Sequence, residues 1–371
     1  MRILITTDAV GGVWEYATTL AQHLAARFSG EVLLTVCGAP PSAAKLAGLT
    51  LGRHPQGGNI EIAHLAIPLE WQGAAPEAYA EAREQILQLA LSWHAHIVHA
   101  NEHYLGELGT SGLPILVVSH SDLCSWQQAV HGDRAEPVDP GYIARVQAGL
   151  RGAALVVAPS RFVAASLYRH YGYGDVIRVI ANGIGEREYP VWERTIDATM
   201  VGRLWDPAKN LACFQQAVAG LRGARFAAVG PLQMRDDGAR APRADGIEYT
   251  GALRNEGVHA LLARSRILVS PAHYDPFGLV VAEGAMAGCC LLLSDIESYR
   301  DIWAETACYF DPRDPRALRT RLLELLEDPA QCERRGATAR EHAHAHYTAE
   351  QMTSAYHRTY QRLALRYGIA I

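Results

Sequence analysis

The stretch SPAHYDPFGLVVAEGAMAGCCLLLSD (Ser270–Asp295) joins a strand end, an acidic turn and an apolar helix. The strand ends at Pro271, and the helix begins near Gly278. The first amides of a helix lack partners, so those around Leu279 and Val280, together with the helix dipole, predict a site for an anion such as a phosphate. A strand that leads directly into such a helix is typical of an α/β fold with a parallel sheet.

Two carboxylates, Asp275 and Glu283, stand on either side of this predicted anion site. An isolated pair of this kind more often comprises a helix cap and a solvated acid. The VVAEGAMAG run, however, indicates a buried helix, and a buried glutamate needs a partner. We therefore expect the pair to hold hydroxyl groups on the two sides of a diphosphate.

A second motif, VGRLWDPAKN (Val201–Asn210), carries Arg203 just after a strand and Lys209 just before a helix. Two such cations are common by chance on a protein surface. Their place at the carboxyl end of a strand, beside the anion-binding helix, favours a functional interpretation. Together they can neutralise a diphosphate without a divalent metal, since arginine binds it through a bidentate fork and lysine as a point charge.

Outward from these motifs, short β-rich runs alternate with helical patterns in two series. The first series is predicted at Arg2–Thr6, Glu31–Cys37, Ile60–Ile67, His96–Ala100, Pro114–His120, Ala154–Pro159 and Val176–Ala181. The second is predicted at Asp197–Gly202, Arg225–Gly230, Ile247–Gly251, Ile267–Pro271, Cys289–Asp295 and Cys308–Asp311. Two similar α/β halves predict two domains with a cleft between them, which is the usual place for a ligand.

The segment Gly185–Asp197 is polar and has no clear period, so it is the best candidate for the linker. We place an N-terminal domain at residues 1–190 and a C-terminal domain at residues 191–347. The final segment, residues 348–371, has apolar or aromatic residues three to four positions apart and is expected to pack back on the first domain.

Composition excludes several classes of protein. A chain of 371 residues with 49% hydrophobic and 20% charged residues can bury a large core. Its net charge of −5 gives no reason to expect a nucleic acid partner. We find no run long enough to span a membrane and no signal peptide. The seven cysteines have no C-x-x-C spacing and are expected to be reduced, so we expect a cytoplasmic protein.

The order of short motifs resembles that of the GT-B glycosyltransferases of family 4 over essentially the whole chain. These motifs are GGVW (Gly11–Trp14), VSH (Val118–His120), VAPSRFV (Val157–Val163), ANGI (Ala181–Ile184), VGR-x5-K and the acidic block. The resemblance implies two Rossmann-like domains facing a cleft. It also implies a hexosyl-type enzyme that transfers a sugar from a nucleotide diphosphate with retention of configuration.

The resemblance also implies a role for each motif residue. Arg203 and Lys209 would bind the donor diphosphate, Glu283 the ribose, and Gly230 would lie under the base. Asp275 and the backbone of Phe277, Gly278, Leu279 and Val280 would contact the donor sugar and phosphates. Gly11 and Gly12 would let the backbone approach the phosphates and acceptor, and His120 would lie against the transferred sugar. His120, Arg203, Lys209 and Asp275 are thus the expected catalytic residues.

No metal or other cofactor is expected, because the cation pair can stabilise the leaving diphosphate. The resemblance implies attack on the face from which the nucleotide departs, with a phosphate oxygen taking the proton of the acceptor. The acceptor would be a glycan, a lipid-linked molecule or a small molecule. Trp126, His131 and Arg134, in a polar segment after His120, are candidate acceptor contacts. The oligomeric state and a peripheral place at the inner membrane face both stay open.

Three positions depart from the family pattern: Asp275 replaces the usual glutamate, Ala181 the usual proline before NG, and Gly185 a frequent aspartate. The shorter acid leaves the donor sugar open. A nucleotide-sugar 2-epimerase on the same fold and a non-catalytic binding protein remain alternatives. An NAD-dependent dehydrogenase is disfavoured, because the first loop, TTDAVGGVWEY, lacks G-x-G-x-x-G.

Overall fold

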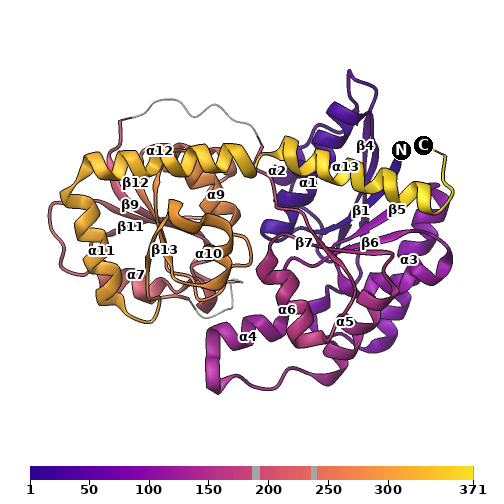
Figure 1. Ribbon diagram of the computed structural model, residues 1–371, viewed down its shortest axis with the longest axis horizontal. Coiled ribbons are helices and arrows are strands. Elements are labelled where there is room, and N and C mark those ends of the chain that lie inside the picture. Colours follow the sequence, from indigo (N-terminus) through magenta and orange to yellow (C-terminus); the bar gives the residue numbers. More distant parts are fainter. Residues whose placement is uncertain (186–192, 235–239, 371) are drawn as a thin grey trace. The chain divides into compact units, whose positions relative to one another are not determined.

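The computed structural model describes residues 1–185, 193–234 and 240–370 (Figure 1). The predicted linker therefore lies largely outside the described residues. The chain forms two compact units. Unit 1 comprises Met1–Ser125, Glu136–Gly185 and Ala349–Ile371, and unit 2 comprises Trp126–Ala135 and Glu186–Thr348. The segment Trp126–Ala135, which the sequence analysis places in the N-terminal domain, thus groups with unit 2.

Unit 1 is built on one sheet with the strand order β3-β4-β2-β1-β5-β6-β7-β8. Its strands are β1 (Arg2–Asp8), β2 (Glu31–Cys37), β3 (Gly52–Arg53), β4 (Asn59–Leu65), β5 (Ile97–Ala100), β6 (Ile115–Val118), β7 (Leu155–Ala158) and β8 (Ile177–Val179). Every neighbouring pair is parallel except β3 and β4. The carboxyl ends of the parallel strands therefore share one edge of the sheet.

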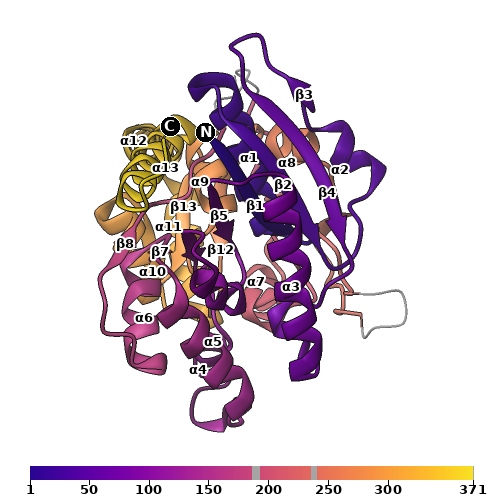
Figure 2. The same ribbon diagram turned by 90° about the vertical axis from the view of Figure 1, so that its right-hand side faces the viewer.

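Helices cover both faces of this sheet (Figure 2). They are α1 (Gly12–Phe28), α2 (Ala43–Ala47), α3 (Pro76–Ser92), α5 (Pro140–Gly152), α6 (Arg161–Tyr171) and α13 (Ala349–Arg366). A further helix, α4 (Leu123–His131), begins in unit 1 and ends in the segment that groups with unit 2. The side chains of β1 alternate between two cores. Ile3 and Ile5 pack with α1 and α13, whereas Leu4 packs with α3.

Unit 2 has a second, fully parallel sheet with the strand order β11-β10-β9-β12-β13-β14. Its strands are β9 (Ile196–Val201), β10 (Phe226–Val229), β11 (Ile247–Gly251), β12 (Ser265–Ser270), β13 (Cys290–Ser294) and β14 (Cys308–Phe310). Its helices are α7 (Leu211–Val218), α8 (Asn255–Ala263), α9 (Leu279–Met286), α10 (Glu297–Trp303), α11 (Pro315–Glu327) and α12 (Pro329–His346). This confirms the predicted α/β fold with two Rossmann-like units.

The last helix, α13, packs against α1 within unit 1 (Figure 1). Its residues Met352, Tyr356, Tyr360 and Leu363 belong to the same buried core as β1 and β2. The Tyr360 hydroxyl also lies 2.6 Å from Nδ1 of His99, a fully buried residue of β5. The helix therefore completes the core of unit 1, although about 260 residues separate it from β5.

We expect a chain that ends at Tyr347 to aggregate. Full burial of a large apolar side chain contributes about 1.5–3 kcal/mol, so losing four of them removes a free energy comparable with the ~5–15 kcal/mol stability of a whole domain. Size-exclusion chromatography and thermal unfolding test this. The control, Leu365→Ser, changes a side chain of the same helix that is 70% exposed and should leave Tm unchanged. A truncated chain that is monodisperse with the Tm of the full chain would contradict the assigned role of α13.

Among the described residues, no helix combines the length and the apolar character that crossing a membrane requires. All seven cysteines are free thiols, as the sequence indicates.

Candidate functional site

Three adjacent strands of unit 2 deliver the predicted donor residues to one edge of its sheet. Arg203 follows β9, Gly230 follows β10 and Asp275 follows β12. Because β10, β9 and β12 are neighbours and parallel, their carboxyl ends lie side by side. The two sequence motifs are therefore brought together by the topology of the sheet.

Lys209 and Asp275 form an ion pair at this edge. The Lys209 Nζ lies 2.8 Å from Oδ2 of Asp275, and both side chains are largely buried, with 19% and 16% of their surfaces exposed. The neighbouring Asn210 fixes the position of the lysine, because its side-chain amide donates to the carbonyls of Pro271 and Pro312, at 2.9 Å each. Since an ammonium has three donors, the pair leaves Lys209 with hydrogen-bonding capacity for an anion.

Asp275 does not cap the helix that follows it. Its Oδ2 accepts from Lys209 and also from the Tyr299 hydroxyl at 3.1 Å. Tyr299 is fully buried, and its hydroxyl also lies 2.7 Å from Oγ of Ser270. Burial, and then the Asp275 charge, raise the pKa of Tyr299 well above its usual value, so this phenol stays a donor. The carboxylate is thus held by two partners from different parts of the chain, the fully buried Tyr299 and the largely buried Lys209.

Arg203 has an acidic neighbour of its own. Its guanidinium donates to Oδ2 of Asp206 at 2.7 and 3.2 Å, while Oδ1 of Asp206 accepts from the Ala208 amide at 2.9 Å. The arginine side chain is 44% exposed, whereas Asp206 is 5% exposed. This ion pair orients the guanidinium and leaves part of it open to a ligand.

The amino end of α9 has the geometry expected of an anion site. Gly278 precedes the helix with φ of 77°, in the left-handed region, and no side chain caps the helix. Leu279 and Val280, in the first turn, are partly exposed, whereas Phe277 is buried. The free amides of this turn are consequently available to a phosphate.

Glu283 lies further along α9 and has a partner that the sequence analysis missed. Its Oε1 is 3.5 Å from Nε2 of His259, a buried residue of α8. At Gly230, a Cβ would lie 1.7 Å from the Gly202 carbonyl oxygen, so only glycine allows the ends of β9 and β10 to approach so closely. Because Gly230 has no side chain, a flat ring can lie against the backbone at this position.

In unit 1, His120 follows β6 and is held by Asn101, which follows β5. Nε2 of His120 lies 2.8 Å from Oδ1 of Asn101. The Asn101 side-chain amide donates to the Thr6 carbonyl at 2.5 Å, which fixes Oδ1 as the atom that faces the histidine. Nε2 of His120 therefore carries the proton, and Nδ1 is left as an acceptor.

Burial, and then the His103 charge, lower the pKa of His120 to about 3. Behind it, a buried chain runs from Glu70 through His103 to Ser119, with contacts of 2.5 Å and 2.8 Å. This chain fixes the end of β6. Ser119 belongs to the VSH motif, but Asn101, Glu70 and His103 belong to none of the short motifs, so the sequence analysis missed these three.

We expect the His120 imidazole to stay neutral throughout the range from about pH 5 to pH 8 in which free histidine titrates. Asn101→Asp should raise its pKa, because the new carboxylate stabilises the imidazolium. Asn101→Leu removes the same hydrogen bond without adding charge and should leave the ring neutral. Proton NMR titration of the histidine ring signals measures all three. Titration of His120 near pH 6.5 in the unmodified chain would contradict the assignment.

The first loop of unit 1 carries Gly11 and Gly12, which are exposed at the start of α1. Lys45 anchors this loop, since its Nζ donates to the Ala9 carbonyl at 2.6 Å. Lys45 and Lys209 are the only lysines in a chain with 34 basic residues, and each makes a specific contact at a candidate site. This scarcity was a signal that the motif-based analysis did not use.

The candidate acceptor residues Trp126, His131 and Arg134 lie in the segment that groups with unit 2. The rings of Trp126 and His131 pack edge to face, 5.5 Å apart. His131 lines a pocket of about 390 Å³ together with Trp205 and His273.

Comparisons with known proteins identify relatives of both units. Residues 10–187 match the family model described as Glycosyltransferase Family 4, and residues 196–328 match Glycosyl transferases group 1. A glycogen synthase of Mycobacterium tuberculosis is 33% identical over 180 residues, which are 44% of this chain and 43% of that protein. A D-inositol 3-phosphate glycosyltransferase of Streptomyces scabiei is 25% identical, covering 95% of this chain and 88% of the relative. This chain thus spans less than half the length of the glycogen synthase that it matches.

Solved structures share the fold. Sucrose-phosphate synthase of Thermosynechococcus elongatus superposes with a TM-score of 0.78 and 19% identity, covering 99% of this chain and 100% of that one. The HepE protein of Anabaena, solved with UDP-glucose, has a TM-score of 0.72 and 16% identity, covering 98% and 100% of the two chains. These similarities show the GT-B fold.

Proposed function

Since the chain belongs to the GT-B glycosyltransferases of family 4, we propose that it transfers a sugar from a nucleoside-diphosphate sugar to an acceptor hydroxyl, with retention at the anomeric carbon. The observation that carries this proposal is the largely buried Lys209–Asp275 pair beside the uncapped amino end of α9. A cation and free amides at one edge suit a diphosphate, and a carboxylate next to them suits the hydroxyls of the attached sugar.

Each residue of this edge has a proposed role. Arg203, Lys209 and the amides from Phe277 to Val280 hold the diphosphate. Asp275 accepts a hydrogen bond from the donor sugar, and Glu283 accepts one from the ribose, for which His259 keeps the carboxylate in place. Gly230 supports the base.

The proposed role of unit 1 rests on His120. Because its Nδ1 is an acceptor, the imidazole can accept a hydrogen bond from a hydroxyl of the transferred sugar without taking up a proton. Gly11 and Gly12 let the backbone approach the phosphates and acceptor. For the acceptor itself we propose a glycan, a lipid-linked molecule or a small molecule, with Trp126, His131 and Arg134 as candidate contacts.

The proposed mechanism uses no metal and no protein nucleophile. The bond between the anomeric carbon and the phosphate oxygen breaks, and its electron pair goes to the diphosphate, whose charge Arg203 and Lys209 stabilise. The acceptor oxygen attacks from the same face and forms the new bond. Its proton passes to the departing phosphate oxygen, so charge and atoms balance without a general base from the protein.

A donor screen tests the first step of this proposal. UDP-, GDP- and ADP-sugars are compared by thermal shift, and UDP-glucose is tested first because a structural neighbour was solved with it. A donor at about 100 times its Kd should stabilise the fold by ~2.7 kcal/mol. We expect Lys209→Ala to lose this stabilisation. Arg222→Ala, which removes an exposed cation of unit 2, should keep it.

Acceptor-dependent release of nucleotide then separates the alternatives. A transferase releases nucleoside diphosphate in step with glycosylated acceptor. A 2-epimerase changes the donor sugar whether or not an acceptor is present, and a binding protein leaves the donor intact.

A further inference from the structure

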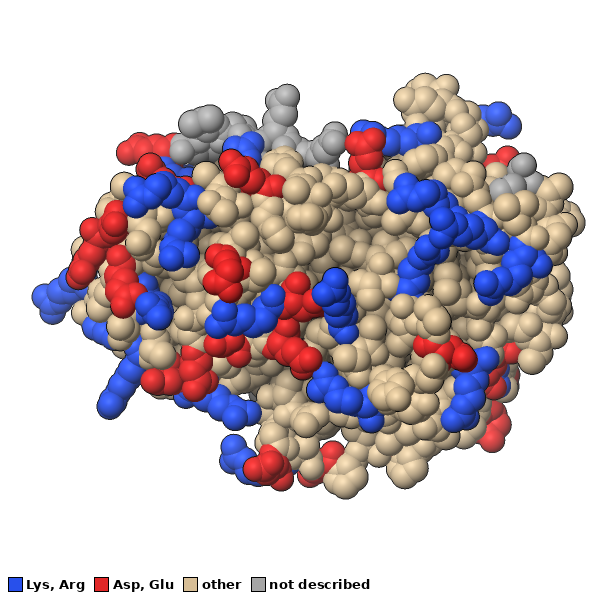
Figure 3. All heavy atoms as spheres, viewed as in Figure 1, with Lys and Arg blue, Asp and Glu red and all other residues tan. Residues whose placement is uncertain are grey.

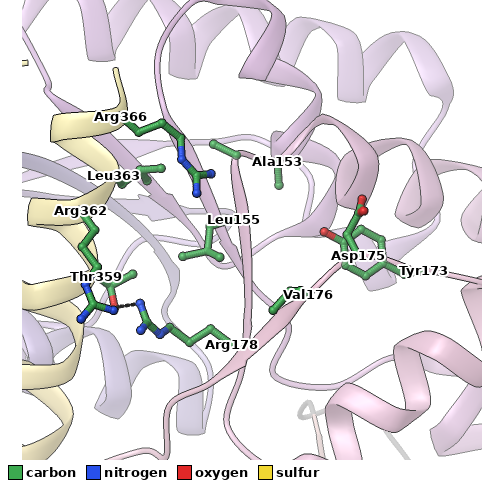
Figure 4. Close-up of a pocket in the computed structure, with 11 residues that line it drawn as sticks. Ala153, Leu155, Tyr173, Asp175, Val176, Arg178, Thr359, Arg362, Leu363 and Arg366 are labelled. Carbon is green, nitrogen blue, oxygen red and sulfur yellow. Dashed lines mark hydrogen bonds between the residues drawn. The ribbon is translucent and has the colours of Figure 1, made fainter. Parts of the chain in front are cut away.

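A second pocket opens on unit 1, at the edge of its sheet opposite the one at which Gly11, Gly12 and His120 lie. It has a volume of about 660 Å³ and lies between the C-terminal half of α13 and the amino ends of β7 and β8 (Figure 4). Gly11, Gly12 and His120 instead follow the carboxyl ends of β1 and β6. None of the residues with a proposed role in sugar transfer lines this pocket.

Three arginines line the pocket from two elements. Arg178 comes from β8, and Arg362 and Arg366 lie one turn apart on α13. The Arg178 guanidinium donates to Oγ1 of Thr359 at 3.1 Å, so it is held toward the helix. Within the described part of the chain, none of the three forms an ion pair. Without a carboxylate partner among the described residues, their guanidinium groups keep N–H donors for an anion.

The surrounding surface is also basic. Figure 3 shows Lys and Arg side chains gathered over the C-terminal half of α13, although the chain as a whole carries a charge of −5. One acid, Asp175, lines the pocket, and Figure 4 shows it across the pocket from Arg362 and Arg366. Arg366 lies in the last turn of α13, where a favourable interaction with the helix dipole is enough to explain an arginine. The same explanation does not apply to Arg178, which lies on a strand.

Apolar side chains complete the lining. Leu155 and Leu363 contribute to the wall, and Val176 is 85% exposed at the pocket. The volume falls within the ~300–1,000 Å³ that is usual for pockets that bind small molecules. An anionic group with a carbon body would satisfy both parts of this lining, because guanidinium groups bind phosphate through paired N–H donors.

We propose that this pocket binds a phosphate ester, whose phosphate is held by Arg178, Arg362 and Arg366 and whose carbon body contacts Leu155, Val176 and Leu363. Soluble metabolites and phospholipid headgroups share this chemistry. The site is separate from the one proposed for the donor diphosphate and does not depend on the assigned transferase activity.

Two binding measurements test the proposal on the full chain. Isothermal titration calorimetry with glycerol phosphate examines a soluble ester. Sedimentation with vesicles of equal parts phosphatidylglycerol and phosphatidylcholine examines a phosphate diester at a membrane surface. Both are made on the unmodified chain and on the double variant Arg362→Gln with Arg366→Gln, in which unchanged Tm shows that the fold is retained.

The matched control is Arg358→Gln, which removes an exposed cation from the same helix outside the pocket. We expect at least ~10-fold weaker binding per pocket arginine removed, the usual scale for a charge-assisted contact, and binding within a factor of about two for the control. Binding in only one of the two measurements would support the site and identify the source of its ligand. The proposal is overturned if neither ester binds, or if Arg358→Gln loses as much affinity as the pocket variant, which would indicate an unspecific basic surface.

Discussion

Replacing Lys209 with alanine should lower turnover by roughly 10²–10³-fold, the scale observed when one preorganised donor is removed from a developing negative charge. The loss has two parts, since the leaving diphosphate loses a cation and Asp275 loses its ion-pair partner at 2.8 Å. The variant should still fold. Asp275 keeps its hydrogen bond from the Tyr299 hydroxyl, and the Lys209 side chain is not part of the hydrophobic core of unit 2. Steady-state kinetics with the donor found in the screen, together with Tm, measure both effects.

Two further variants divide this loss. Lys209→Arg keeps the charge but changes its shape, so an intermediate rate is expected. Arg222→Ala removes an exposed cation of the same unit and should leave turnover unchanged. If Lys209→Ala retains turnover within a factor of two of the unmodified chain, Lys209 does not bind the diphosphate.

Asp275→Asn should lose most of the activity. The amide replaces one of two acceptor oxygens with a donor, and a buried polar group left mispaired costs about 1–3 kcal/mol, which is roughly 5–150-fold in rate. Asp275→Glu instead keeps the carboxylate and changes only the length of the side chain. Since a hydrogen bond to a sugar hydroxyl depends on reach, the longer acid should change the preference among donor sugars while nucleotide affinity stays much the same.

The control for Asp275 is Asp197→Asn. Asp197 lies near the amino end of β9, at the opposite end of this strand from Arg203. Asp197 also sits in an ion pair, with Arg266 at 3.3 Å, so its replacement tests the general effect of removing a paired carboxylate from unit 2. We expect kcat/KM for every donor to be unchanged in this control. If Asp275→Asn is fully active, Asp275 has a structural role and does not bind the donor sugar.

The sheet was predictable from the sequence to a useful precision. Every strand predicted by the alternation of β-rich and helical runs is present, with ends shifted by at most two residues. Strands such as β2 are continuous apolar runs because helices cover both of their faces, and such runs stand out in a sequence. The two-residue strand β3 was not predicted. The helix α4 was not predicted either, because only Ser125 is buried in it and it has no apolar stripe of its own.

The contacts that organise the site were harder to predict. The Lys209–Asp275 pair joins residues 66 positions apart, and the sequence analysis gave each residue a role but did not pair them. His99, in β5, is fully buried, and its ring contacts the hydroxyls of Tyr16 and Tyr360, the second of which is 261 positions away. Only the packing of α13 on α1 reveals this, because local patterns do not encode a partner so distant in the chain.

The central claim is sugar transfer from a nucleoside-diphosphate donor, and NMR of a single reaction tests it most directly. The chain is mixed with the donor that binds it, an acceptor preparation and EDTA, and phosphorus and proton signals are followed together. We predict conversion of the sugar-linked diphosphate to free nucleoside diphosphate, with a new anomeric proton signal of the same configuration as in the donor. A donor that persists unchanged, one whose sugar is epimerised in place, or turnover that EDTA abolishes would contradict the account.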